Sequence, residues 1–600
     1  MVLGIADLVI RVLAVGIIPG NRRPTTAMAW LLGIFFVPFV GIVLFLLFGN
    51  FKLSSRRREQ QQLVNDRVRA GTSSLADFES SYPGPEWVKS AAELNRKLGS
   101  LPMVDGNSVD LIPGYPDSIL AMTEAVRKAK KFVNAEFYIM STDHVTDELL
   151  TALEEAAERG VEVRVLFDHI GTLRVKGYRK LLKRLRAGKI QWKRMLPLLP
   201  IHGQWRRPDL RNHRKIMVID GEVAFTGSQN LIEPSYNNPK HRKAGREWVE
   251  LMACLRGPIV TTLNVVFATD WLSETDEPLE HQLQLPANPE PGKVTAQVVP
   301  SGPGFITENN LRLFNTLIYS AQHRISICSP YFVPDDSLLY AITTAAQRGV
   351  DVELFVSEKG DQFLVHHAQR SYYEALLEAG VRIYLYKAPF VLHAKHFTID
   401  DEVAVLGSSN MDMRSFSLNL EVSVMLLGAD IVTKMRAVED TYRDISHELK
   451  LTDWINRPLA ARYVDNVARL TATVHQMVST IDARLLPGSS RAEAVAACFP
   501  AGSMTGAPKI STMAILDRLE GGPRGLYSGA IGYFSLNGAT DLAVAIRTLV
   551  ISTHGDGTAE LTLGVGGAIT ADSVPEEEYE EIRTKAFGVL STLGTRFPED

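Results

Sequence analysis

The sequence predicts an α/β protein that begins with a transmembrane helical hairpin, continues as two pseudo-symmetric α/β lobes and ends in a partial α/β segment. Three observations lead to this prediction: a long apolar run near the start, a strand–helix–strand pattern that occurs twice, and one polar motif that follows each copy. The chain has 600 residues, of which 46% are hydrophobic and 22% charged, and this composition excludes an intrinsically disordered or collagen-like protein.

The first fifty residues, 1–50, are expected to form the hairpin. The 23 residues from Ala27 to Gly49 carry no charge, and at about 1.5 Å per residue a helix of this length spans the hydrocarbon core of a bilayer. Residues 3–19 are also apolar but contain Asp7 and Arg11, so they form either a marginal first span, which the hairpin requires, or an interfacial helix. A secretory signal peptide fits poorly because Arg11 interrupts the apolar run and no small-residue cleavage site is evident.

A basic juxtamembrane linker is expected at residues 51–100. Positively charged side chains follow the second span, namely Lys52, Arg56, Arg57, Arg58, Arg67 and Arg69. The positive-inside rule then places the C-terminal body on the cytoplasmic side of the inner (cytoplasmic) cell membrane, with these side chains against anionic phospholipid headgroups. The net charge of −4 argues against nucleic acid as a partner, and three cysteines are too few for a disulfide framework.

The two lobes are expected at residues 101–285 and 298–472, separated by a linker rich in proline and glycine at 286–297. Each lobe is predicted to contain an apolar strand, a helix and a second apolar strand. These elements are placed at 132–138, 149–159 and 161–167 in the first lobe, and at 325–329, 338–348 and 350–356 in the second. The string Arg-Gly-Val-Glu-Val that starts at Arg159 returns as Arg-Gly-Val-Asp-Val at Arg348. Such units form sheets with right-handed crossovers.

Each lobe ends in the same polar motif, with lysine, aspartate, serine and asparagine at +2, +7, +15 and +17 from a histidine. The first copy consists of His213, Lys215, Asp220, Ser228 and Asn230, and the second of His393, Lys395, Asp400, Ser408 and Asn410. Polar residues scattered on a surface strand do not explain offsets that agree at four positions. The duplication therefore indicates one site built from two halves.

The residue types suit the chemistry of a phosphodiester. Histidine and lysine two residues apart on a strand lie on one face, so two copies bring two imidazoles and two lysines into one cleft. One imidazole attacks phosphorus and becomes a phosphohistidine, while the other protonates the leaving alkoxide and then deprotonates the acceptor. The lysines and asparagines are expected to bind the phosphate oxygens, and the serines to help bind or orient the substrate. Because the lysines supply the positive charge, no metal and no other cofactor are expected at this site.

Carboxylates complete the predicted site. Glu247 and Glu421 follow the two motifs, each close to an apolar run, and are expected to accept from imidazole Nδ1–H and so orient the rings; the alternative is that both are ordinary, partly buried glutamates. Asp220 and Asp400 belong to the predicted catalytic motif, but each precedes a tight turn. We interpret these two aspartates as structural, pairing with lysine or with backbone groups.

These residues resemble the paired HKD motifs of the phospholipase D superfamily, and in particular its cardiolipin synthase branch. The likeness covers about residues 5–470 and includes the strings at 22–30, 211–215 and 407–421. It implies two phospholipase D-like lobes, with His213 as nucleophile and His393 as acid and base. It also implies phosphatidyl transfer between two phosphatidylglycerol molecules with release of glycerol, with phosphatidylglycerol, other anionic phospholipids and the bilayer as partners.

The last segment, residues 473–600, resembles the C-terminal half of para-aminobenzoate synthase component I, a chorismate-binding enzyme. The resemblance implies that His475 belongs to that family's histidine motif. It also implies that chorismate is contacted by Thr505, Tyr533, Arg547 and Gly566, and that a Mg²⁺ site contains Glu578 and Glu581. The family's upstream strings Pro-Ile-Lys-Gly-Thr and Asp-Leu-Val-Arg-Asn-Asp are absent from the sequence. Half of a single-core domain does not bury its own sheet, so we expect a truncated remnant without chorismate activity, and Mg²⁺ only if that activity were present.

Three alternatives remain beside phosphatidyl transfer. A phospholipase D-type hydrolase needs the same motifs, and only exclusion of water from the cleft separates it from a transferase. A chorismate-dependent aminodeoxychorismate synthase activity of the tail is opposed by the missing upstream strings. A membrane scaffold with a decayed site is opposed by two intact motifs.

Overall fold

The computed structural model describes the chain mainly in two parts. The first part comprises residues 84–99, 101–198, 209–283, 292–303 and 308–458, and the second 502–505, 509–520, 524–534, 540–545, 548–554 and 558–566, with a few isolated residues besides. The predicted membrane hairpin lies outside the described residues except for Ile34. Within the described part of the chain, no helix combines the length and apolar character needed to cross a bilayer.

The first lobe is a seven-stranded sheet with helices on both faces. Its strands run in the order β4-β3-β2-β6-β7-β9-β1, in which β2, β3 and β4 are parallel and the others antiparallel. Their bounds are β1 (Met103–Ile112), β2 (Phe132–Phe137), β3 (Glu162–Asp168), β4 (Gln191–Met195), β6 (Lys215–Ile219), β7 (Val223–Gly227) and β9 (Met252–Arg256). The main helices are α6 (Tyr115–Lys128), α7 (Asp147–Glu158), α9 (Tyr178–Ala187) and α11 (Ile259–Thr275).

The second lobe repeats this order as β14-β13-β11-β16-β17-β19-β10, with β20 (Ser446–Leu449) added at the outer edge. Its strands are β10 (Val294–Ser301), β11 (Arg324–Cys328), β13 (Asp351–Ser357), β14 (Arg382–Tyr386), β16 (His396–Ile399), β17 (Val403–Gly407) and β19 (Asn419–Leu427). Its helices are α12 (Asn309–Ser320), α13 (Asp336–Gln347), α14 (Phe363–Arg370), α15 (Tyr373–Glu378), α17 (Ala429–Ile445) and the short α18 (Leu451–Ile455). The predicted α/β class and its internal repeat are therefore confirmed.

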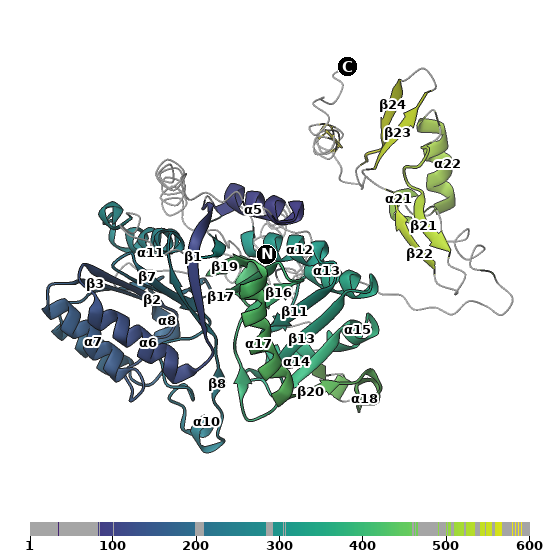
Figure 1. The fold of residues 1–600 in the computed structure, drawn as a ribbon. Helices are drawn as coiled ribbons and strands as arrows, with labels where there is room; N and C mark the ends of the chain where they lie inside the picture. The colour runs from purple at the N-terminus through teal and green to yellow at the C-terminus, as the bar shows by residue number, and fades with distance from the viewer. Residues whose placement is uncertain are drawn as a thin grey trace, which may run out of the picture. The chain divides into compact units, whose positions relative to one another are not determined.

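The two lobes share one sheet because β1 pairs antiparallel with β10 (Figure 1). The pseudo-twofold axis implied by the strand order passes between these two strands. A single cluster of buried side chains crosses the junction and includes Val104, Leu255, Val298 and Leu426. The lobes are thus parts of one body, so side chains from both can be fixed relative to one another.

Two segments expected to be linkers are structured at their ends. Residues 86–99 of the predicted juxtamembrane linker form helix α5, whose Val88, Ala91 and Ala92 are buried in the core of the second lobe. Strand β10 begins at Val294, inside the linker predicted between the lobes. Both segments contain apolar residues at helix or strand spacing, and burial against a neighbouring core stabilises them.

The glycine of each Gly-Ser motif is required by close packing of two strands. A Cβ atom on Gly227 would lie 2.3 Å from the carbonyl oxygen of Leu251, and one on Gly407 would lie 2.2 Å from that of Val422. Glycine is therefore the residue that lets β7 approach β9, and β17 approach β19, next to the motif serines.

The C-terminal residues from Val478 form a second compact unit. Its described elements are α21 (Gly502–Thr505), α22 (Lys509–Leu519) and the hairpins β21–β22 (Ala530–Phe534, Thr540–Val544) and β23–β24 (Leu549–Thr553, Ala559–Leu563). Apolar side chains in it are exposed, among them Leu519 at 77% and Ile551 at 59%. Large exposed apolar side chains of this kind are typical of an interaction surface or of an incomplete core.

Candidate active site

The two motif histidines follow short strands that pair with the opposite lobe. His213 comes directly after β5 (Arg211–Asn212), which pairs parallel with β19 of the second lobe. His393 comes directly after β15 (Val391–Leu392), which pairs parallel with β8 (Trp248–Val249) of the first lobe.

The backbone at each histidine continues this pairing across the lobes. The His213 N–H donates to the carbonyl of Leu420 at 2.9 Å, and the His393 N–H donates to that of Val249 at 2.7 Å. Each lobe therefore holds the histidine of the other.

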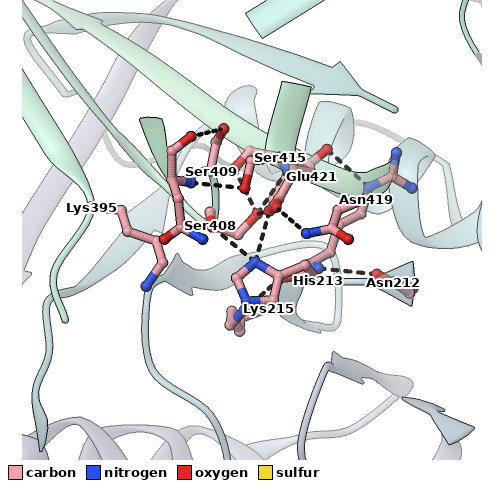
Figure 2. Close-up of polar contacts among 12 residues, drawn as sticks. Asn212, His213, Lys215, Lys395, Ser408, Ser409, Ser415, Asn419 and Glu421 are labelled. Carbon is pink, nitrogen blue, oxygen red and sulfur yellow. Dashed lines mark hydrogen bonds and ion pairs between the residues drawn. The ribbon is translucent and has the colours of Figure 1, made fainter. Parts of the chain in front are cut away.

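Glu421 orients His213. Imidazole Nδ1 lies 3.0 Å from Glu421 Oε2 and 3.0 Å from the Ser408 carbonyl oxygen, and the Ser408 hydroxyl donates to the same carboxylate at 2.5 Å (Figure 2). Burial alone would raise the pKa of Glu421, but the neighbouring His213 and Lys215 hold it below its ordinary value. An ionised carboxylate accepting from Nδ1–H leaves Nε2 with a free lone pair.

Glu250, rather than the predicted Glu247, orients His393. Its Oε1 lies 2.8 Å from imidazole Nδ1, and its side chain is 1% exposed. The Glu247 side chain is exposed, and its backbone carbonyl accepts from the N–H of Val391. The prediction for Glu247 is therefore wrong.

The error has a simple origin in the unequal connections of the two lobes. Glu250 lies 20 residues after Asn230, whereas Glu421 lies 11 residues after Asn410. The longer connection includes helix α10 (Pro239–Lys243). One signal in the sequence marks the correct residue: Glu250 directly precedes the apolar run 251–255, and Glu421 directly precedes the mainly apolar run 422–427.

The two lysines lie beside their histidines and are almost completely buried. The Lys215 ammonium donates to the His213 carbonyl at 2.5 Å, and that of Lys395 donates to the His393 carbonyl at 2.7 Å. Burial lowers the pKa of Lys215 to about 7, with Lys395 as the next cause, and burial lowers the pKa of Lys395 to about 8. An anion bound between them would favour their charged forms, so the pair is suited to a phosphate.

Both imidazoles are also almost enclosed, with 8% of His213 and 5% of His393 exposed. Burial lowers the pKa of His213 to about 4, opposed by Glu421, and lowers the pKa of His393 in the same way, opposed by Glu250. At neutral pH the His213 imidazole is therefore uncharged. Aromatic rings lie against both imidazoles, Tyr138 at 4.9 Å from His213 and Tyr331 at 6.2 Å from His393.

The motif aspartates are not at the catalytic centre, which corrects their place in the predicted catalytic set. The Asp220 carboxylate accepts from the backbone N–H groups of residues 130, 131 and 132, at 2.7–2.9 Å. Asp400 does the same with residues 322, 323 and 324. Asp220 therefore joins the end of β6 to the start of β2, and Asp400 joins the end of β16 to the start of β11. The interpretation of both as structural residues bonded to backbone groups agrees with these contacts.

The remaining motif side chains lie around the histidines. The Ser228 hydroxyl pairs with the backbone of Leu251, as the Ser408 hydroxyl does with Val422. Asn230 Oδ1 accepts from the Ile139 N–H at 3.1 Å. Asn410 Oδ1 is buried without a hydrogen-bond partner in the described structure, which leaves that side chain with unused hydrogen-bonding capacity.

Arg214 is a site residue that the motif reading missed. Its side chain pairs with Asp270 of α11, and its Nε donates to the Glu421 carbonyl at 3.1 Å. Arg214 therefore joins the backbone of the carboxylate to the first lobe. The sequence does carry a signal for it: Arg214 stands between His213 and Lys215, where the second motif has Ala394, so this arginine is a feature of the first motif alone.

The tail residues are only partly described. Thr505 ends α21, Tyr533 lies in β21, and Gly566 follows β24. His475, Arg547, Glu578 and Glu581 lie outside the described residues. Across the portions of the chain that the structure covers, no three or more His, Cys, Asp or Glu side chains form a group that could hold a metal ion.

Family models agree with this architecture. The model described as cardiolipin synthase, PLD-like domain matches residues 122–271 and 314–440, one range in each lobe. The phospholipase D-nuclease N-terminal model matches residues 8–50, and the chorismate binding enzyme model matches residues 464–591. The body of the chain is thus phospholipase D-like, with one half-site in each lobe.

Curated relatives narrow this class. Cardiolipin synthase A of Pectobacterium carotovorum subsp. carotovorum (strain PC1) is 34% identical over 454 residues, which are 74% of this chain and 92% of the relative. Cardiolipin synthase A of Proteus mirabilis (strain HI4320) is 34% identical over 460 residues, with the same coverage. The chain belongs to the cardiolipin synthase family, and it is a phosphatidyltransferase. The predicted family, enzyme class and transfer reaction are confirmed.

A solved structure supports the fold. The crystal structure of phosphatidylserine synthase from Haemophilus influenzae Rd KW20 aligns with a TM-score of 0.50 at 14% identity, covering 64% of this chain and 99% of that one. At this identity the likeness concerns the fold alone.

Proposed function

We propose that the protein transfers a phosphatidyl group between two phosphatidylglycerol molecules through a phosphohistidine on His213, and so makes cardiolipin and releases glycerol. The observation that carries the proposal is the crossed pairing of His213 with Glu421 and of His393 with Glu250 around two buried lysines. The pairing gives each imidazole a fixed tautomer.

In the first step, the lone pair of His213 Nε2 attacks the phosphorus of one phosphatidylglycerol. The N–P bond forms as the P–O bond to the headgroup glycerol breaks, and protonated His393 gives its proton to the leaving alkoxide. The Glu250 carboxylate and the bound phosphate favour the charged form of His393 for this purpose. Lys215 and Lys395 stabilise the charge that builds on the phosphoryl oxygens.

The second step reverses the roles. His393, now neutral, takes the proton from a headgroup hydroxyl of the second phosphatidylglycerol, and the resulting oxygen nucleophile attacks phosphorus. The P–N bond to His213 breaks, cardiolipin leaves, and both imidazoles return to their starting states. Every charge is held by this chain's own side chains, so the mechanism needs no metal.

The burial of the site favours transfer over hydrolysis. The two histidines are 8% and 5% exposed, and the two lysines 0% and 3%. A phosphohistidine formed in such surroundings is shielded from water, while a lipid hydroxyl brought in by its own acyl chains is not excluded.

The membrane context is part of the proposal. The N-terminal family match at residues 8–50 coincides with the predicted hairpin, and both substrates are bilayer lipids. We infer that residues 1–50 anchor the enzyme in the inner membrane with its catalytic body on the cytoplasmic side, as the basic residues after the second span predict.

The C-terminal unit is proposed to have no chorismate activity and no need for Mg²⁺. The upstream strings of that family are missing from the sequence, and apolar side chains of the unit are exposed. Formation of aminodeoxychorismate by the protein from chorismate and ammonia would contradict this.

The proposal is tested with the full chain reconstituted in vesicles that contain phosphatidylglycerol. Cardiolipin and free glycerol in equal amounts are expected, whereas phosphatidic acid as the main product would make the protein a hydrolase. The variant His213→Ala is expected to form neither cardiolipin nor a labelled phosphoenzyme, and full activity in that variant would overturn the assignment of the nucleophile.

A further inference from the structure

Four segments surround the active site at one edge of the shared sheet. Three of them follow the carboxyl ends of β3, β13 and β14, and the fourth follows the Gly-Ser motif of the first lobe. Strands β6 and β16, which come after His213 and His393, start at the same edge because they run antiparallel to β2 and β11. We call residues 169–180, 239–247, 358–366 and 387–392 the docking edge.

The docking edge exposes large apolar side chains from both lobes. Phe363 is 67% exposed, Leu364 is 54%, Leu173 is 50% and Phe390 is 39%. Leaving such side chains in water is unfavourable, and apolar groups gathered on one edge mark an interaction site rather than isolated surface residues.

In the second lobe, two of these apolar residues follow directly after residues that bind Tyr331, whose ring lies near the catalytic histidine. The Tyr331 ring lies 6.2 Å from the His393 ring, its hydroxyl donates to Asp361 at 2.9 Å, and Gln362 donates to that hydroxyl at 3.0 Å. Phe363 and Leu364 follow at the start of α14. Phe390 lies three residues before His393 in the chain.

In the first lobe, Leu173 is placed in a similar way. It ends α8 (His169–Leu173), and the neighbouring Thr172 hydroxyl donates to the carbonyl of Tyr138, whose ring lies 4.9 Å from that of His213. The apolar residues of both lobes therefore border the same site.

The docking edge is strongly basic. Its exposed cationic side chains are Arg174, Lys176, Arg179, Lys180, Lys240, Arg242, Lys243, Lys359 and Lys387, whereas Glu247 is its one exposed acidic side chain. Helix α10, which carries three of these cations, projects from the first unit below the sheet (Figure 1). The chain as a whole has a net charge of −4, so this excess is local.

We infer that the docking edge lies on the surface of a bilayer rich in anionic phospholipid, with Phe363, Leu364, Leu173 and Phe390 inserted among the acyl chains. Apolar groups surrounded by lysine and arginine fit an anionic lipid surface, since insertion and headgroup attraction then act together. The inference rests on the proposed function and extends it: the headgroup phosphate reaches His213 and His393 while the acyl chains stay in the membrane.

Insertion is measured directly by fluorescence on the full chain in proteoliposomes. A polarity-sensitive label is placed at Phe363→Cys, or at Tyr319→Cys as the control, with Cys498 replaced by serine; Cys254 and Cys328 are buried. Tyr319 is 45% exposed near the end of α12, which leads to the start of β11 at the opposite edge of the sheet. Brominated phosphatidylglycerol is expected to quench the label at 363 and not at 319, and equal quenching or none at either position would overturn the inference whether or not cardiolipin is made.

A kinetic experiment tests the consequence for catalysis. The double variant Phe363→Ser/Leu364→Ser is expected to lose tenfold or more of its activity on vesicle phosphatidylglycerol, yet to keep wild-type activity on a short-chain phosphatidylglycerol dissolved as monomers. The matched control Tyr319→Ser keeps both activities. Equal activity of the double variant and wild type on vesicles would refute docking, whereas a wild type that makes no cardiolipin from either substrate would refute the proposed function instead.

Charge is tested in the same vesicles. The double variant Lys240→Glu/Lys243→Glu is expected to need a higher fraction of anionic lipid for half-maximal activity. An unchanged lipid requirement would contradict the role of the basic residues.

Discussion

Replacement of Glu250 by glutamine tests the crossed pairing most sharply. The change keeps nearly the same volume but removes the charge that faces His393 Nδ1 at 2.8 Å in a position that is 1% exposed. A hydrogen bond to a charged group contributes about 1.5–3 kcal/mol, and about 1.4 kcal/mol corresponds to a tenfold change in rate. We therefore expect kcat to fall by about 10- to 150-fold.

The assay is the conversion of labelled phosphatidylglycerol to cardiolipin, together with acid quenching to measure the phosphoenzyme. Because His393 gives a proton to the leaving alkoxide and later takes one from the acceptor, Glu250→Gln is expected to slow both formation and breakdown of the phosphohistidine. Glu421→Gln instead weakens the orientation of the nucleophile His213, so less phosphoenzyme forms.

Glu247→Gln is the matched control, with the same change three residues away on an exposed side chain. Exposed substitutions alter free energies by about 0.5 kcal/mol or less, so its rate should stay within about twofold of wild type. Wild-type activity in Glu250→Gln, or a large loss in Glu247→Gln, would refute the crossed arrangement.

Four further predictions concern other parts of the structure. Phosphate binding needs protonated lysines, so kcat/KM should fall as pH rises through about 7 to 8, the pKa values of Lys215 and Lys395 in the free enzyme. Lys215→Arg should move this fall in kcat/KM to higher pH, and a wild-type profile that stays flat to pH 9 would contradict the role of the lysines. Asp220→Asn weakens three backbone hydrogen bonds and should lower the free energy of unfolding by about 2–4 kcal/mol, measured by denaturant titration with Glu222→Gln as control. Arg214→Lys cannot hold both Asp270 and the Glu421 carbonyl and should lower kcat by about tenfold with KM unchanged; a change confined to KM would argue against positioning. Removal of residues 478–600 should leave the rate of transfer unchanged, because every described residue of the active site belongs to the first unit, and loss of transfer in a folded variant would show otherwise.

Much of the site could be predicted because its information is local. The offsets between His213, Lys215, Ser228 and Asn230 lie within one stretch of β-strands and turns, where alternation decides which side chains share a face. The same offsets around His393 indicate that both copies fold alike. Matching of the two copies fails at Glu250, because the connection that precedes it is longer in the first lobe.

The predicted linkers show a second limit of sequence reading. Residues 86–99 are partly polar, and their sequence alone does not say which core receives Val88, Ala91 and Ala92. That choice depends on a neighbouring surface contributed by the second lobe, more than two hundred residues away in the chain. Burial against a distant surface leaves no local pattern.

The sequence by itself determined the α/β class, the internal repeat, the family and the histidine–lysine pairs, because each depends on residues close together in the chain. Only the tertiary structure decided that Glu421 of one lobe serves His213 of the other, and that Glu250 serves His393 in return. The reason is that β5 and β15 each pair with a strand of the opposite lobe. Hydrogen bonding between strands is satisfied in space, whatever the separation along the chain.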